Sequence, residues 1–192
     1  MIVGNPLSFA IESEIIQAYE QPSLRALGFF LVHVCGRQYG VREPDATMLA
    51  CSLDEVERRL DARGSHTAPF AKEPDANKIA EAYCNAIYAD RQDASYLGME
   101  VMEFCRCFQR DANSLAWAPD GDQAFDDGSH VLHFDVADQV RLIAFTRNRG
   151  YLYDPGTITD VWLKAEGFYS ILQRWLTAFH DEWESVPKMP IA

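Results

Sequence analysis

The segment from Trp117 to Arg147, WAPDGDQAFDDGSHVLHFDVADQVRLIAFTR, carries the clearest fold signal in the chain. After a turn-rich start, apolar residues recur at every second position in two runs, 131–136 and 140–145. Side chains alternate across a strand, so a period of two predicts two β-strands, and residues 137–139 suit a hairpin turn between them. The segment therefore predicts an antiparallel hairpin with an apolar side, preceded by a loop.

The N-terminal forty residues predict two more hairpins. Residues 1–19 read as strand, turn and strand. In the second of these strands Glu12 and Glu14 are two positions apart, so we expect both on the solvent face. A β-rich run at 27–34 and a shorter one at 38–41 flank a Cys-Gly-Arg turn, which predicts the second hairpin.

Helical periodicity appears in four places. Ser52 and Glu55 have the spacing of a capping box, which predicts a helix that begins at Ser52. Asp75 can cap a second helix, and a third is predicted over residues 98–110. Apolar residues at spacings of three, four, seven and eight between 168 and 183 predict the longest helix.

These elements, with a last strand at 159–164, predict an α+β fold. We expect a single domain over residues 1–192, with a mainly antiparallel sheet built from hairpins. Several helices, including the long C-terminal amphipathic helix, would pack on that sheet. A chain of 192 residues is long enough to bury a substantial core.

The composition is that of a folded, acidic protein. Hydrophobic residues make up 48% and aromatic residues 12% of the chain, a content that disordered chains lack. Seventeen Lys and Arg against 29 Asp and Glu give a net charge of −12. Such a surface repels nucleic acid and anionic membranes and favours basic partners, although the same charge also serves ordinary solubility. We therefore predict neither a nucleic-acid nor a membrane partner.

The cysteines and the N-terminal residues indicate the cytoplasm. Five cysteines at irregular spacing do not suit the disulfide framework of a small secreted protein. The first twenty residues lack a basic start and contain three glutamates, unlike a signal peptide. The longest apolar run, residues 28–34, is too short to span a bilayer.

A cluster of aspartates precedes the central hairpin and is the strongest candidate site: Asp120, Asp122, Asp126 and Asp127. An EF-hand that started at Asp120 would need Gly at its sixth position and Glu at its twelfth, where this chain has Phe125 and Val131. A looser calcium or magnesium site stays open. The other interpretations are an acidic docking loop, or a turn in which each Asp accepts bonds from nearby backbone amides.

Other catalytic and metal patterns do not fit. Cys105 and Cys107 diverge on a helix, and His130 and His133 point to opposite faces of a strand, so a zinc site is not predicted. Gly-Ser-His at 64–66 recurs at 128–130 without the flanking glycines of a nucleophile elbow. The chain has no Gly-rich phosphate loop and no dinucleotide fingerprint. We therefore predict no catalytic residue, no metal ligand and no cofactor.

Three segments together resemble the immunity protein 42 type: MIVGNPLSFAIESE, YGVREPDATMLA and WAPDGDQAFDDGSHVLHFDV with VRLIAF. They span residues 1–145 in matching order. Members of such families are antidotes of bacterial polymorphic-toxin and contact-dependent inhibition systems. The resemblance implies a protein that binds and blocks a cognate toxin domain, often a nuclease, and it implies no catalytic motif.

The resulting hypothesis is a non-enzymatic, cytoplasmic immunity protein whose acidic surface occludes the basic cleft of a toxin. The expected toxin-binding residues are the four aspartates of the loop, extended by two glutamates of the N-terminal strand: Asp120, Asp122, Asp126, Asp127, Glu12 and Glu14. Two alternatives stay open. One is a metal-dependent hydrolase that uses the 120–127 carboxylates, and the other is an interaction module without a toxin partner.

Overall fold

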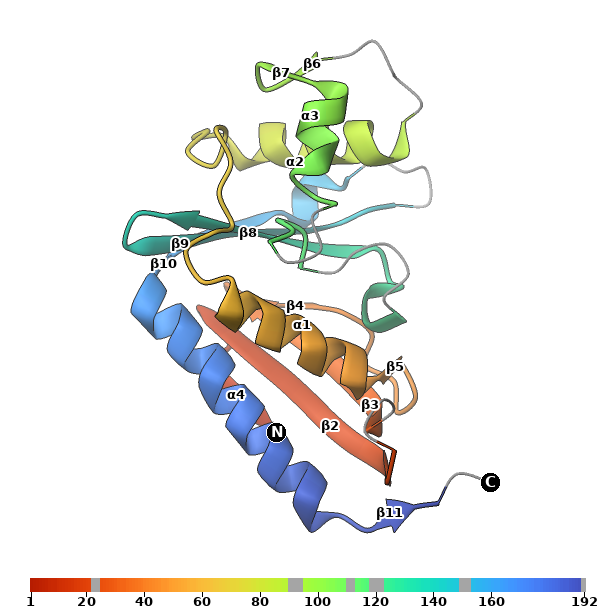
Figure 1. The fold of residues 1–192 in the computed structure, drawn as a ribbon. Helices are drawn as coiled ribbons and strands as arrows, with labels where there is room; N and C mark the ends of the chain where they lie inside the picture. Colours follow the sequence, from red (N-terminus) through yellow and green to blue (C-terminus); the bar gives the residue numbers. More distant parts are fainter. Residues whose placement is uncertain (22–24, 90–94, 110–112, 118–122, 149–152, 191–192) are drawn as a thin grey trace.

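The computed structural model of this chain has a layered α+β architecture (Figure 1). It describes residues 1–21, 25–89, 95–109, 113–117, 123–148 and 153–190. The predicted fold class is confirmed: antiparallel strand pairs dominate, and helices cover them.

The first sheet is built from the two predicted N-terminal hairpins. Its strands follow in the order β1 (Ile2–Asn5), β2 (Phe9–Tyr19), β3 (Ala26–Val34) and β4 (Arg37–Tyr39). Two short strands join it: β5 (Thr47–Met48) pairs with β3, and β11 (Lys188–Met189) pairs in parallel with β2. A separate two-stranded ribbon consists of β6 (Ser95–Tyr96) and β7 (Met99–Glu100).

The second sheet contains the predicted central hairpin. It has the order β10-β9-β8, with β8 at Ser129–Val136, β9 at Gln139–Thr146 and β10 at Thr159–Lys164. Ala137, in the turn between β8 and β9, adopts a left-handed conformation with φ 55°. The sequence predicted that only one side of this hairpin would be apolar and buried. In the structure every residue of β8 is buried, so both sides of the strand are covered. This sheet lies between two cores, so both of its faces are covered.

In the part of the chain that the structure describes, four helices surround the sheets: α1 (Leu49–Asp61), α2 (Ala76–Tyr88), α3 (Val101–Arg106) and α4 (Ala165–Ser185). The long C-terminal helix is confirmed, and the Asp75 side chain caps α2 by accepting a bond from the backbone amide of Asn77. The predicted third helix is shorter than expected. The described residues also contain the 3-10 turns η1 (Gln123–Phe125) and η2 (Pro155–Thr157).

The predicted start of the first helix is wrong. Helix α1 begins at Leu49, and Met48 occupies the capping position without a side-chain hydrogen bond. Ser52 therefore lies inside the helix, where it is buried and its hydroxyl has no hydrogen-bond partner. Glu55 instead forms ion pairs with Arg58 and Arg59. The capping-box pattern failed because the strand β5 runs directly into the helix and sets its first turn.

Two hydrophobic cores lie on opposite faces of the second sheet. One face packs with α1, α4 and the first sheet, around Trp117, Phe168 and Trp175. The other face packs with α2 and α3, around Phe104 and Phe145. Figure 1 shows this order of layers, with β8, β9 and β10 in the middle of the molecule.

Candidate functional site

The predicted acidic loop is only partly within the described residues. Asp120 and Asp122 lie outside them, whereas Asp126 and Asp127 follow η1 and are exposed. The carboxylate of Asp127 accepts one bond from the backbone amide of Ser129 and one from its hydroxyl, both of 2.9 Å. Asp127 therefore acts as a turn former, which is one of the interpretations that the sequence left open.

Of the two glutamates on β2, Glu14 is exposed as expected, but Glu12 is not on a solvent face. Glu12 is 8% exposed and forms ion pairs with Arg42 and with His33 Nε2, the latter at 2.8 Å. Burial raises the pKa of Glu12, but the hydrogen bonds from Arg42 and His33 outweigh it, so the pKa is lower than usual. The expectation of a free carboxylate at Glu12 is thus corrected, because Arg42 folds over it.

Residues 40–42 connect the acidic turn after η1 with Glu12 on β2. The Gly40 amide donates to the hydroxyl of Ser129, the residue that Asp127 holds, at 3.2 Å. The Val41 amide donates to the carbonyl of Ala124 in η1 at 2.8 Å. Arg42 then reaches Glu12. The structure therefore joins the turn after η1 and the outer face of β2 through one short segment.

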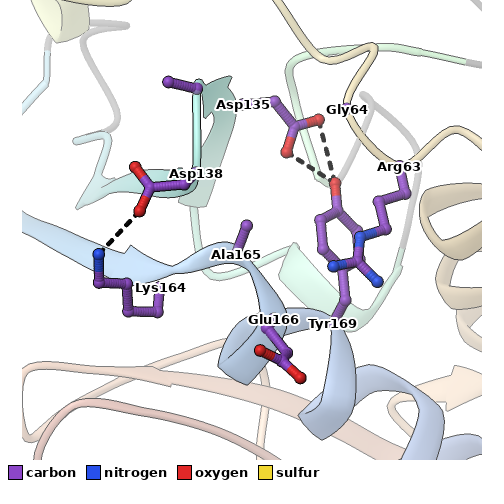
Figure 2. A pocket seen from close by; sticks show the side chains of 9 residues that line it. Arg63, Gly64, Asp135, Asp138, Lys164, Ala165, Glu166 and Tyr169 are labelled. Atoms are coloured by element: carbon purple, nitrogen blue, oxygen red, sulfur yellow. Dashed lines mark hydrogen bonds and ion pairs between the residues drawn. The ribbon is translucent and has the colours of Figure 1, made fainter.

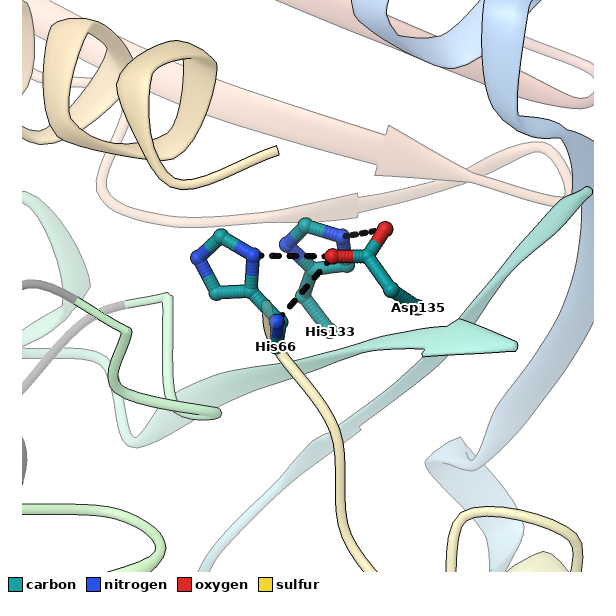
Figure 3. Close-up of side chains that lie close together, drawn as sticks. All are labelled: His66, His133 and Asp135. Atoms are coloured by element: carbon teal, nitrogen blue, oxygen red, sulfur yellow. Dashed lines mark hydrogen bonds and ion pairs between the residues drawn. The ribbon is translucent and has the colours of Figure 1, made fainter. Parts of the chain in front are cut away.

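A buried polar cluster that the sequence did not predict lies between the second sheet and α4. His133 and Asp135 lie on the same face of β8, and His66 comes from the segment after α1 (Figure 3). The Asp135 carboxylate accepts bonds from His66 Nδ1 and from the His66 backbone amide, both at 3.1 Å. The Tyr169 hydroxyl on α4 donates to the same carboxylate at 2.8 Å.

Arg59 fixes the tautomer of His133. Its guanidinium donates to His133 Nδ1 at 2.9 Å, and an arginine can only donate. His133 Nδ1 is therefore unprotonated, and neutral His133 carries its proton on Nε2, which lies 3.5 Å from Asp135 Oδ1. Burial lowers the pKa of His133 to about 3, so the ring stays neutral near pH 7. Burial acts to raise the pKa of Asp135, but the bonds from His133, His66 and Tyr169 outweigh it and hold that pKa well below its usual range.

Proximity alone makes this cluster a candidate metal site within the described part of the chain. The ligand atoms of His66, His133 and Asp135 all lie within 4.8 Å of one another. A neutral histidine that binds a metal through Nε2 must carry its proton on Nδ1. In His133 that nitrogen accepts from Arg59, whose positive charge also opposes a cation nearby. The residues present therefore fit an internal hydrogen-bond cluster and not a metal-ligand set.

A pocket of about 360 Å³ opens beside the cluster, at the junction of β8, β10 and α4 (Figure 2). Asp135 and Tyr169 meet at one wall, and the Arg63 guanidinium lies over the Tyr169 ring at 4.9 Å from its centre. Lys164 and Asp138 pair at 2.8 Å on another wall. Among the charged side chains that line the pocket, Lys164 and Asp138 pair with each other, whereas Asp135 and Arg63 contact Tyr169.

The sequence contained a partial signal for the buried cluster. His133 and Asp135 are two positions apart in a predicted strand, which places both on one face. His66 belongs to a Gly-Ser-His segment that lacks the flanking glycines of a nucleophile elbow and carries no other functional signal in the sequence. Arg59 and Tyr169 could not be assigned, because only the packing of α1 and α4 brings them to β8.

The architecture is that of a solved immunity protein. The structure of CdiI from Burkholderia dolosa AUO158 matches with a TM-score of 0.59, covering 93% of this chain and 99% of that chain. The two sequences are 16% identical, so this likeness concerns the fold alone. No curated protein matches the chain. Within the described residues, no helix has the length and apolar character needed to cross a membrane.

The family is shown by the sequence itself. The sequence model of immunity protein 42 matches residues 1–178 of the 192-residue chain. The chain therefore belongs to the immunity protein 42 family, and its role is toxin immunity. This confirms the resemblance found in the three sequence segments.

Proposed function

We propose that the protein binds a cognate toxin domain in the cytoplasm and neutralises it by covering a basic, nucleic-acid-processing cleft with an acidic surface. Membership in the immunity protein 42 family is the observation that carries the immunity role. The net charge of −12 supports a basic partner, because a cleft that binds phosphates must present Lys and Arg. In this proposal the protein acts by binding, without catalysis or a cofactor.

The proposed contact surface is centred on the turn after η1 and the outer face of β2. Asp126 and Glu14 are exposed and available to a partner. Asp120 and Asp122, which lie outside the described residues, are proposed as toxin-binding residues from the sequence alone. Asp127 and Glu12 have their carboxylates engaged by Ser129 and Arg42. In the proposed surface, Asp127 and Glu12 stabilise the local structure, and their carboxylates contribute less to the attraction of a basic partner.

Co-expression tests the proposal directly. The toxic domain encoded by the gene directly upstream is expressed from an inducible promoter, alone and together with this protein. We expect growth arrest with the toxin alone, rescue with the protein, and a stable complex on copurification. Cleavage assays on DNA and RNA with the purified toxin domain then identify its activity. Growth arrest that persists despite soluble protein would contradict the immunity role, and a rescued toxin without nuclease activity would contradict only the proposed target.

A further inference from the structure

The two edges of the second sheet differ in how they are covered. At β8, the backbone amides of His133 and Asp135 donate to the carbonyls of Leu115 and His66. Ala116 also forms an isolated bridge with Leu132, so the β8 edge is closed by neighbouring segments. At the other edge, β10 is the last strand in the order β10-β9-β8.

The backbone of β10 is regular and open. All six residues pair in continuous antiparallel register with β9, and the strand contains no proline and no bulge. In such a pair every second residue directs its amide and carbonyl away from the neighbouring strand. Among the described residues, no protein group forms a hydrogen bond with these outward-directed groups of β10. An unpaired edge of this kind is a template for another extended chain.

Trp162 gives this edge a rigid apolar anchor. Its side chain is 41% exposed, and the guanidinium of Arg141 lies 5.2 Å from the centre of its ring. Arg141 is buried and held by Asp160 through two bonds of 2.9 and 2.8 Å, and by the carbonyls of Ala71 and Glu73. An exposed tryptophan on such a fixed support loses little entropy when a partner covers it, as is typical of binding hot spots.

Charge selects the occupant of the edge. A second copy of this chain would bring another −12 charges to the contact, which opposes self-association. The carboxylate of Asp160 is already paired with Arg141, and Lys164 is paired with Asp138. Glu166, exposed at the start of α4, therefore leaves this edge with an excess negative charge, which favours a basic partner. An extended segment with alternating apolar and basic side chains could place one apolar group against Trp162 and pair its backbone with β10.

We propose that β10 is a docking edge at which an extended segment of the cognate toxin domain adds a fourth strand to the second sheet. This inference rests on the proposed function, since it identifies how the toxin is held. The acidic turn after η1 leads into β8, the opposite edge strand of the same sheet.

Amide hydrogen exchange resolved by residue tests the strand addition. The exchange of the β10 amides is measured by NMR in the free protein and in its complex with the inactivated toxin domain from the upstream gene. In the free protein the amides directed at β9 should be protected, and the alternate ones should exchange fast. In the complex the alternate amides should slow by at least about tenfold. Contact through side chains alone would not produce this alternation.

A variant pair tests the anchor. Trp162→Ala should weaken toxin binding by about 30-fold, the loss expected of a hot-spot tryptophan. Met102→Ala is the matched control, because Met102 is an exposed apolar residue on α3, which packs against α2. The control should leave the dissociation constant unchanged. Circular dichroism and thermal melts establish that both variants are folded.

The outcomes separate this inference from the proposed function. If the toxin is bound and neutralised while the hydrogen exchange of the β10 amides is unaltered, the proposal that β10 is a docking edge is wrong and the immunity role stands. If the alternate amides are already protected in the free protein and light scattering shows a dimer, a second copy occupies the edge and the inference is overturned. Failure of the wild-type protein to bind or rescue overturns the proposed function together with the inference.

Discussion

At the scale of single residues, His133 makes stability depend on pH. Its pKa is about 3 in the folded protein, against 6.5 for a histidine exposed to water, so only the unfolded chain takes up a proton between these values. Stability from this residue is therefore complete above pH 6.5 and falls as the pH is lowered towards 3, by at most about 1.4 kcal/mol per pH unit. Asp135, whose pKa is also lowered, adds a loss only below its unfolded value of 3.8.

The substitution His133→Gln isolates this effect. Glutamine can accept a bond from Arg59 and donate one towards Asp135, but it does not titrate. We expect the wild-type free energy of unfolding to fall between pH 6.5 and 4, and the variant to lose much less over the same interval. Urea denaturation at pH 7, 6, 5 and 4 measures both. Parallel pH dependences would show that another group controls acid sensitivity.

Trp175 is the residue whose truncation should cost the most. It is fully buried beside Phe30 and Phe179, and its ring nitrogen donates to the Ser13 hydroxyl at 3.0 Å. Trp175→Ala should lower the free energy of unfolding by about 3–5 kcal/mol. The same substitution at the partly exposed Trp162 removes less buried surface and should cost clearly less. Equal losses at the two positions would mean that the core is not centred on α4.

At the scale of elements, Ser52 distinguishes the two possible starts of α1. If Ser52 capped the helix, Ser52→Ala would cost about 1 kcal/mol. In the structure its hydroxyl is buried inside α1 without a hydrogen-bond partner, so removing it should leave stability unchanged or raise it. Thermal melts of wild type and variant decide between the two, and a marked loss of stability would restore the capping box.

The pairing of β2 with β3 depends on a glycine. A Cβ at Gly28 would lie 1.9 Å from the carbonyl oxygen of Glu14 on the neighbouring strand, next to the register shift between Ile15 and Gln17. Gly28→Ala should therefore destabilise the protein by about 1–3 kcal/mol, since the strands must separate locally. Gly167 in α4 is the control, because a Cβ there meets nothing within 4 Å. Gly167→Ala should stabilise by up to about 1 kcal/mol. A tolerated Gly28→Ala would show that β2 can shift freely.

At the scale of the whole molecule, the net charge should govern how fast the toxin is captured. Asp122→Asn combined with Asp126→Asn removes two negative charges from the proposed contact surface. We expect slower association at low salt, a smaller deficit as salt is raised, and a nearly unchanged melting temperature. Stopped-flow association measures the rate. Asp181→Asn, on the exposed side of α4, is the control at a distant position. An association rate equal to that of wild type at low salt would remove the acidic turn from the interface.

The local elements and the family could be predicted from the order of residues alone. Alternation over 131–145 specified the central hairpin, and the apolar spacing between 168 and 183 specified α4, because each pattern matches the geometry of one element. The start of α1 was missed because tertiary contacts of β5 outweigh a local capping preference. The three segments that resemble immunity protein 42 were sufficient to indicate the family.

Which polar residues meet depends on how the helices and sheets pack against one another. Glu12 and Glu14 follow the same alternation in sequence, yet Arg42 covers one of them and leaves the other exposed. Arg59, His66, His133, Asp135 and Tyr169 come from four separate segments, and burial of apolar faces brings them into one cluster. The periodicity of a strand or helix states which face is apolar, but not which other face will cover it. The environment of each ionisable group, and hence its charge, follows from that packing.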